Sequence, residues 1–426
     1  MIYNETRYNS HWNTKKLSDL GIFARGKSKH RPRDDERLYE GGGYPLIQTG
    51  EVKAANLYIT KHEQEYGKFG LAQSKMWDAG TLCITIAANI AETAILSYPM
   101  CFPDSVVGFR AYPEESSELF MHYVFTYIRN SIQNSVSGSI QDNINIDYLS
   151  QLDFKIPDKA YQDKVVCILG AIDQKIDTNN RTSEELEAMA KTIYDYWFTQ
   201  FDFPDADGNS YRSSGGAMEW NEQLKSSIPK RWKVRPLIDV LDLLKDGTHN
   251  PPKRHPEGIP LLTGTMFGNT VLNYKGVTYI AESDYLSIHS NYTPQKNDVI
   301  MTKIGSVGAV NILREDDIPL AIHCNSALIR FKKEIPVSYA FFMLKGSVFQ
   351  AFLKKEISKT VQEFVSLERL SRISICVPPD DIISRFAEIA DGILDKMILL
   401  EEENRELTKL RDWLLPMLMN GQATVE

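Results

Sequence analysis

The sequence is poor in cysteine and contains no long apolar run. Its five cysteines are scattered through 426 residues, with no CxxC pair and no histidine cluster beside them, which argues against a disulfide framework or a zinc site and favours buried thiols. No apolar stretch approaches the roughly 18 residues of a membrane helix. The N-terminal stretch MIYNETRYNSHWNT lacks the apolar core of a signal peptide. We therefore expect a cytoplasmic protein without a metal site.

Catalytic motifs are missing as well. The eight histidines are dispersed, no Ser/His/Asp or Cys/His set can be assembled locally, and no glycine-rich cofactor loop follows an expected strand. The tetrapeptide NPPK (250–253) is one residue away from the Asn-Pro-Pro-aromatic signature of adenine-N6 methyltransferases, but Lys253 cannot stack on a flipped base. Asp158 followed by Asp173 and Lys175 mimics a metal-dependent nuclease motif, yet positions i and i+2 of a helix point apart. We predict no catalytic residue and no cofactor bound by this chain.

One stretch of the sequence occurs twice. FKIPDKAYQDKVVCILGAIDQKI (154–176) returns as ICVPPDDIISRFAEIADGILDKM (375–397) at a constant offset of 221 residues. The offset holds from 139–198 to 360–419. Weaker matches precede it in the same order: Trp12 with Trp232, YPLIQTG (44–50) with IPLLTG (259–264), and DSVVGFR (104–110) with NSALIRF (325–331). A long repeat at a fixed period indicates two copies of one structural unit.

Both repeated stretches carry a heptad pattern. In the first copy the spacings alternate between four and three, with polar members in mid-seam that can fix the register: Val165, Leu169, Ile172, Ile176, Asn179, Ser183, Leu186, Ala190, Ile193 and Trp197. The second copy gives a similar seam with one stutter: Phe386, Ile389, Ile393, Met397, Leu400, Asn404, Leu407 and Leu414. We expect two helices of about forty residues, roughly 60 Å long, that pack antiparallel because each needs a partner for its apolar seam.

The segments before the helices indicate mixed domains. TLCITIA (81–87) and DVIMTKIG (298–305) suit buried strands, while LFMHYVFTYIRN (119–130) and SYAFFMLKGSVFQAFL (338–353) suit amphipathic helices. We predict an α+β protein in which two mixed α/β domains are separated by two long helices forming an antiparallel coiled coil, with an internal pseudo-two-fold repeat. The expected boundaries are 1–156 for the first domain, 157–201 for its helix, 202–226 for a linker, 227–377 for the second domain and 378–420 for its helix.

Charge is unevenly distributed along the chain. The net charge is −8, yet residues 225–378 alone carry +7, so the acidity resides in the helices and linker. In the first copy the basic run is ARGKSKHRPR (24–33), and KDGTHNPPKRH (245–255) stands at the matching place in the second. Such loops suit backbone contacts to phosphates, with Thr, His, Asn and Arg side chains reaching base edges. A solvated charged loop is the alternative for either loop alone, but its occurrence in both copies favours DNA.

The order of these features resembles the DNA-specificity subunit of type I restriction-modification enzymes. The resemblance spans essentially the whole chain and rests on the IP step into a long helix, YWFTQFDFP (196–204), IPKRW (228–232), KDGTH and DVIMTKIGSVG (298–308). It implies two target-recognition domains, each reading one half of a bipartite site in double-stranded DNA, with the helices as a spacer. It also implies a non-enzymatic subunit that docks two methyltransferase subunits, which use S-adenosylmethionine to methylate adenine N6, and motor-nuclease restriction subunits.

Candidate site residues follow from the loops and the helix ends. We expect DNA contacts from the two basic loops, namely Arg25, Lys27, Lys29 and Arg31 in the first and Thr248, His249, Lys253 and Arg254 in the second. Thr302 and Lys303 are secondary candidates, because the same segment could be an interior strand and turn. The loops differ in length and content, which predicts an asymmetric site. Candidate partner contacts are Trp197, Phe198, Trp413 and Leu415, unless these are plain seam residues.

Two other functions explain part of the sequence. A coiled-coil scaffold with two protein-interaction domains would account for the helices and the missing catalytic motifs, but not for the paired basic loops. Its binding would be insensitive to salt, unlike DNA binding. A stand-alone methyltransferase with fused recognition domains would need a cofactor-binding domain, for which the chain leaves no room.

Overall fold

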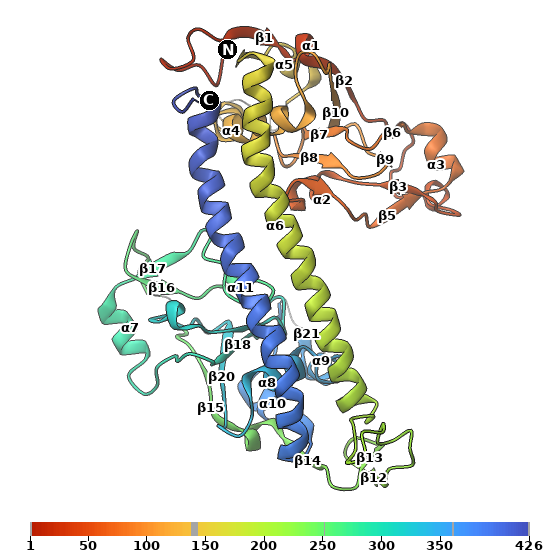
Figure 1. The fold of residues 1–426 in the computed structure, drawn as a ribbon, viewed down its shortest axis with the longest axis vertical. Helices are drawn as coiled ribbons and strands as arrows, with labels where there is room; N and C mark the ends of the chain where they lie inside the picture. The colour runs from red at the N-terminus through yellow and green to blue at the C-terminus, as the bar shows by residue number, and fades with distance from the viewer. Residues whose placement is uncertain (1, 138–143, 251, 360–361, 425–426) are drawn as a thin grey trace. The chain divides into compact units, whose positions relative to one another are not determined.

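The computed structural model describes residues 2–137, 144–250, 252–359 and 362–424. The chain forms two compact units, one made of residues 1–177 with 405–426 and the other of residues 178–404. Both divisions fall inside long helices, α6 (Lys159–Tyr194) and α11 (Asp380–Met419), which are labelled in Figure 1. Each unit therefore combines one globular domain with part of both helices. Positions 139–143 and 360–361 of the sequence repeat lie outside the described residues.

The first unit is built on a sheet with the strand order β2-β10-β7-β8-β4. Its neighbours are antiparallel except for β4 and β8, and β7 and β8 are buried along their whole length, as their mostly apolar sequences require. A second sheet has the order β5-β3-β9-β6. The elements are β1 (Asn13–Lys16), α1 (Leu17–Leu20), β2 (Gly21–Arg25), β3 (Tyr44–Leu46), α2 (Thr49–Ala54), β4 (Tyr58–Ile59), β5 (Gln64–Tyr66), α3 (Lys68–Gln73), β6 (Met76–Trp77), β7 (Leu82–Thr85), β8 (Thr93–Leu96), β9 (Met100–Cys101), β10 (Val106–Ala111), α4 (Glu118–Ser137), α5 (Ile146–Ser150) and β11 (Asp153–Ile156).

The second unit repeats the first four strands of that sheet. Its order is β15-β20-β18-β19, all antiparallel, and β18, from the predicted strand DVIMTKIG, is buried. This shared order confirms the internal repeat. The elements are β12 (Met218–Asn221), β13 (Ser226–Pro229), β14 (Lys233–Pro236), β15 (Leu241–Asp246), β16 (Ile259–Leu261), β17 (Thr278–Ile280), α7 (Glu282–Ile288), β18 (Val299–Thr302), β19 (Val310–Ile312), β20 (Ser326–Phe331), α8 (Val337–Lys345), α9 (Ser347–Glu356), β21 (Ser358–Lys359), β22 (Glu363–Phe364), α10 (Leu367–Ser371) and β23 (Ser374–Val377).

Within each unit the two long helices run antiparallel. In the first unit the Tyr161 hydroxyl donates to the Ala423 carbonyl at 2.7 Å, whereas Asp173, further along α6, pairs with Arg411 at 2.9 Å. Asp173 also accepts a hydrogen bond from the Tyr123 hydroxyl at 2.6 Å. The carboxylate of the nuclease-like motif is therefore part of a helix contact, and the expectation that the motif is a coincidence agrees with this placement.

In the second unit the helices meet through a polar layer and then through aromatic rings. The Asn179 side chain donates to Glu403 and Asn404 at 2.8 and 2.9 Å. Further along α6, the ring of Tyr194 lies 5.9 Å from that of Phe386. Asn179, a polar member of the first predicted seam, thus faces polar partners, as a device that fixes register requires.

The seam predicted for α11 is wrong at one position. Ile389 is 43% exposed and its neighbour Ala390 is buried, whereas Phe386 and Met397 are buried as predicted and Ile393 is half-buried. The reason is that α11 packs against its own globular domain as well as against α6, so apolar residues occur on more than one face and the heptad could be drawn through the wrong ones. On α6, by contrast, the predicted positions from Val165 to Trp197 are all buried or half-buried.

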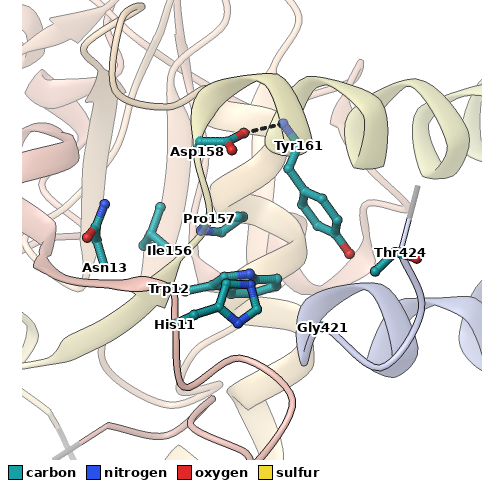
Figure 2. A pocket seen from close by; sticks show the side chains of 9 residues that line it. All are labelled: His11, Trp12, Asn13, Ile156, Pro157, Asp158, Tyr161, Gly421 and Thr424. Atoms are coloured by element: carbon teal, nitrogen blue, oxygen red, sulfur yellow. Dashed lines mark hydrogen bonds between the residues drawn. The ribbon is translucent and has the colours of Figure 1, made fainter. Parts of the chain in front are cut away.

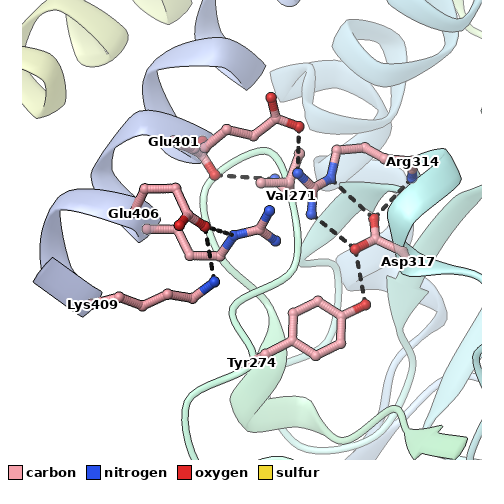
Figure 3. A network of polar contacts seen from close by, with 9 residues as sticks. Val271, Tyr274, Arg314, Asp317, Glu401, Glu406 and Lys409 are labelled. Carbon is pink, nitrogen blue, oxygen red and sulfur yellow. Dashed lines mark hydrogen bonds and ion pairs between the residues drawn. The ribbon is translucent and has the colours of Figure 1, made fainter.

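A network of polar contacts fixes the second globular domain to α11 (Figure 3). Arg314 pairs with Asp317 at 2.9 Å and with Glu402 at 2.5 Å. The Tyr274 hydroxyl donates to Asp317 at 2.8 Å. Next to this network the Val271 N–H donates to the Glu401 carboxylate at 3.2 Å, and burial raises the pKa of Glu401. The domain is thereby held on the helix by directional contacts in addition to apolar packing.

Candidate nucleic-acid interface

Both basic loops leave the same strand of the repeated sheet. In the first unit the loop begins after Arg25, the last residue of β2, which is paired with Val107 of β10. In the second unit it begins after Asp246, the last residue of β15, which is paired with Ala327 of β20. The two loops therefore stand at the same corner of equivalent sheets, each beside the turn that precedes the central strand.

Hydrogen bonds to a neighbouring helix hold the first loop in place. The Ser74 hydroxyl donates to the Lys27 carbonyl at 2.9 Å, and the Gln73 side-chain oxygen accepts from the N–H groups of Lys29 and His30 at 2.6 and 3.0 Å. Gly26 is needed at the start of the loop, because a Cβ there would lie 2.2 Å from the Phe102 carbonyl oxygen. The fixed backbone directs the side chains of Lys27 and Lys29 to solvent.

Acidic residues neutralise much of the charge on this loop. Asp104 accepts a hydrogen bond from Arg25 through its carbonyl at 2.9 Å, and its carboxylate pairs with Arg33 at 2.6 Å and with Arg31 at 3.8 Å. Among the residues that the structure describes, the ammonium groups of Lys27 and Lys29 have no such partner. Of the four residues predicted in this loop, these two lysines are the cations most available to an external anion.

Asp35 closes the far end of the first loop. Its carboxylate lies 2.6 Å from Arg37 and 2.7 Å from His30. The hydrogen bond from Arg37, followed by that from His30, holds the pKa of Asp35 well below its usual range. The loop thus ends in an ion pair that persists over any physiological pH.

The second loop is anchored to the turn before β20. The Thr248 N–H donates to the Ile322 carbonyl at 3.2 Å, and the Cys324 N–H donates to the Thr248 carbonyl at 3.1 Å. Gly247 is required there, because a Cβ would lie 1.6 Å from the Ile322 carbonyl oxygen. The Thr248 hydroxyl is used within the loop, donating to the Asn250 carbonyl at 2.8 Å.

The remaining candidates of the second loop point to solvent. The His249 ring is 3.5 Å from the Asp246 carboxylate and its side chain is 74% exposed. Lys253 and Arg254 are exposed and, within the described part of the chain, have no hydrogen-bond or ion-pair partner. Residue 251 of the NPPK tetrapeptide lies outside the described residues.

Thr302 and Lys303 are interior residues. Both are buried, the Thr302 hydroxyl donates to the Ser306 carbonyl, and Lys303 pairs with Asp246 at 2.7 Å. The alternative of an interior strand and turn is therefore the right one, and the prediction that they face DNA is wrong. Lys303 instead pairs with Asp246, the last residue of β15, which precedes the second loop.

Sequence reasoning missed the turns that adjoin the loops. Asp104 organises the arginines of the first loop, and Asn325, at the equivalent position of the repeat, accepts a hydrogen bond from Cys324 in the second. Beside Asn325, partial burial and the nearby charges of His249 and Arg254 lower the pKa of His323. The match between DSVVGFR and NSALIRF, which starts at these two residues, was the signal that could have identified them.

Three of the four candidate partner contacts are buried within this chain. Trp197 and Phe198 belong to the aromatic core of the second unit, and Leu415 belongs to the core of the first. These three fit the alternative of interior residues, because each packs into the globular core at its end of the long helices. Trp413 is 57% exposed and keeps its place as a candidate.

No group of three or more potential metal ligands occurs among the described residues. None of the helices in the described ranges is long and apolar enough to cross a membrane.

Comparison with known proteins decides the family. The family model described as "Type I restriction modification DNA specificity domain" matches residues 9–188 and again 229–409, one match for each copy of the repeat. The chain belongs to this family. Among relatives, the type I restriction enzyme MjaIX specificity subunit of Methanocaldococcus jannaschii is 23% identical over 97% of this chain and 94% of that protein. The HindI specificity subunit of Haemophilus influenzae is 26% identical over 68% of this chain and 73% of that protein.

The fold is shared with a solved member of the type I systems. The crystal structure of the S subunit of a type I restriction-modification system from M. genitalium superposes with a TM-score of 0.56 at 18% identity, covering 98% of this chain and 99% of that one. The similarity confirms the fold of a specificity subunit: paired mixed domains, each joined to a long helix. The family resemblance seen in the sequence is confirmed by the match to the family model over both copies of the repeat.

Proposed function

We propose that this specificity subunit reads an asymmetric bipartite site in double-stranded DNA, one half with each unit. The observation that carries the proposal is the placement of the two basic loops. They leave equivalent strands of equivalent sheets, but their sequences differ throughout. Equal placement gives both units the same approach to a duplex, and unequal side chains give them different half-sites.

The residues of the loops divide into two roles. Lys27 and Lys29 in the first unit, and Lys253 in the second, are exposed cations suited to phosphate contacts that position the protein. Arg31 is held near Asp104 and His249 near Asp246, while Arg254 projects from the second loop into solvent. Side chains of these types are suited to base edges in the major groove. Thr248 supports the loop and supplies an additional polar group.

The helices and the partners complete the proposed function. Residues 159–194 form an uninterrupted helix of about 54 Å at 1.5 Å per residue, long enough to act as a rigid spacer between half-sites. The chain itself would hold no cofactor. It would dock two methyltransferase subunits, which supply S-adenosylmethionine and methylate adenine N6, and motor-nuclease restriction subunits, with Trp413 as a contact.

Long-read sequencing of adenine methylation tests this function. Cells carrying the protein with its methyltransferase subunit are compared with cells lacking only this chain, and with cells in which the chain carries alanine at Lys27 and Lys29. An asymmetric split motif that disappears with the deletion is the expected result. An unchanged methylation pattern in the deletion strain, with the methyltransferase present, would contradict it and favour a scaffold.

A further inference from the structure

The first unit contains a pocket beside Trp12. It has a volume of about 410 Å³, and its walls include Trp12, Pro157, Tyr161 and Thr424, as Figure 2 shows. This volume lies within the roughly 300–1,000 Å³ typical of ligand sites. None of the residues proposed to contact DNA lines it.

The walls of this pocket have counterparts in the second unit. Trp12 and Trp232 each close a turn by donating a backbone N–H to the carbonyl three residues earlier, at 3.0 and 2.9 Å. In each copy the residue after the tryptophan pairs with the residue before the proline that both copies share. Asn13 pairs with Ile156, before Pro157, and Lys233 pairs with Val377, before Pro378. The two tryptophans therefore occupy the same place in the fold.

The segments that follow the long helices also correspond. The Asp202 N–H donates to the Tyr196 carbonyl at 2.9 Å, and the Ala423 N–H donates to the Met417 carbonyl at 3.0 Å. The two donors, Asp202 and Ala423, are 221 residues apart, and so are the two acceptors, Tyr196 and Met417, which is the offset of the repeat. At this offset Thr424 stands where the second unit has Phe203.

Aromatic rings fill the equivalent place in the second unit. Phe203 stacks on Trp232 at 5.4 Å and on Tyr211 at 4.7 Å, and Phe201 meets Trp232 edge-on at 5.2 Å. In the first unit the matching residues are Gln422 and Thr424, neither of which has a ring. By this correspondence the pocket lies beside Trp12 where Phe201 and Phe203 lie beside Trp232 in the second unit.

We propose that this pocket binds an aromatic side chain carried on an extended segment of a partner protein, as Phe203 is carried beside Trp232. The site is preformed, because the Tyr161 hydroxyl donates to the carbonyls of Ala423 and Leu418 at 2.7 and 3.3 Å. Its ring lies 5.4 Å from that of Trp12. Stacked and edge-on rings attract one another beyond their apolar contact, and a preformed site loses little conformational entropy on binding. The proposal does not depend on DNA recognition.

A peptide taken from the second unit serves as the probe. Labelled TQFDFPDA, the sequence of residues 199–206, is titrated into the full chain and followed by fluorescence anisotropy. The control peptide carries alanine in place of both phenylalanines. We expect saturable binding of the first peptide and none of the second.

Variants locate the binding at the pocket. Thr424→Phe rebuilds the arrangement of the second unit from within, and we expect it to weaken peptide binding by about tenfold or more without lowering the unfolding temperature. Thr424→Ser keeps the pocket empty and should bind as the parent does. His11→Ala, which removes another ring from the wall, is the second test and should also weaken binding.

Three results would overturn the proposal. One is no saturable binding of the peptide, and another is equal binding by Thr424→Phe, His11→Ala and the parent. The third is competition by N-acetylphenylalanine amide at the same concentration as the peptide, which would identify a small-molecule pocket. Because no DNA or methyltransferase is present, failure here leaves the methylation experiment as a separate test.

Discussion

Asn179 on α6 donates a side-chain hydrogen bond to Asn404 on α11 at 2.9 Å. Asn404 in turn donates to Asn180 at 2.8 Å, and Asn179 is only 2% exposed. In another register the buried amide of Asn179 would lose these partners, which costs about 1–3 kcal/mol. The pair therefore selects one alignment of the helices.

Substitution of Asn179 tests this role in register. We expect Asn179→Leu to lower the free energy of unfolding by about 1–3 kcal/mol, because Asn404 and Glu403 lose a donor. The double variant Asn179→Leu, Asn404→Leu should recover part of the loss. Urea unfolding measures both, and Lys191→Leu, on the exposed side of α6, is the control for adding leucine. A single variant as stable as the parent would contradict the role.

The lysines of the loops should control the salt dependence of DNA binding. Replacing Lys27 and Lys29 by alanine removes two phosphate contacts, so the slope of log K against log salt should become less steep by about 0.9 per contact. Affinity should fall evenly for all sequences. The double variant Lys253→Ala, Arg254→Ala should lower affinity and, in addition, relax the sequence specificity at the second half-site.

Matched controls for these variants lie at the opposite end of each sheet. Lys16 precedes β2 and Lys333 follows β20, so both are exposed cations far along the strand from the loops. Lys16→Ala and Lys333→Ala should leave DNA affinity unchanged. Equal losses from loop and control variants would show that only the overall charge matters.

Lys303 should matter for stability and not for salt dependence. It is 6% exposed and pairs with Asp246 at 2.7 Å. Lys303→Ala leaves the Asp246 carboxylate without its ammonium partner. We expect the free energy of unfolding to fall by about 3 kcal/mol. At a temperature where the variant is folded, its salt slope for DNA should equal that of the parent. A shallower slope would show that Lys303 contacts phosphate.

Arg314 should hold the second domain on α11. Arg314→Lys keeps the charge but cannot make the paired contacts to Asp317 and Glu402. We expect it to lower stability by about 1–3 kcal/mol, measured by calorimetry. The comparison is Arg385→Lys. Arg385 lies on α11 and donates to the Pro204 carbonyl, and its substitution should have a smaller effect.

Two buried histidines should make the fold sensitive to mild acid. Burial lowers the pKa of His122 from 6.5 to about 3 and that of His289 to about 4. As the pH falls, the two histidines bind protons in the unfolded chain before they do so in the folded chain. Their full contribution to the free energy of unfolding is therefore present above about pH 6.5. It should then decrease towards pH 4 by up to about 1.4 kcal/mol per pH unit for each histidine. Urea unfolding between pH 7.5 and 5 checks this, and His122→Gln should reduce the slope.

The parts of the site that follow from local pattern could be predicted. The basic loops were located because both copies place them after the tryptophan and before the segments YPLIQTG and IPLLTG, and the strand TLCITIA was evident from its apolar run. What could not be predicted was which cations are already paired. Arg31 and Arg33 share Asp104, 71 or more residues away in sequence, and Lys303 meets Asp246 across 57 residues.

The sequence by itself determined the two copies, the two long helices and the polar residues that align them, because repeats and heptads are recorded in spacing alone. Only the tertiary structure decided which apolar side chains are buried. Ile389 is exposed while Ala390 is buried, and Trp197 and Phe198 face an aromatic core. The physical reason is that a helix in contact with both a second helix and a globular domain has two apolar faces, and periodicity cannot tell which face meets which partner.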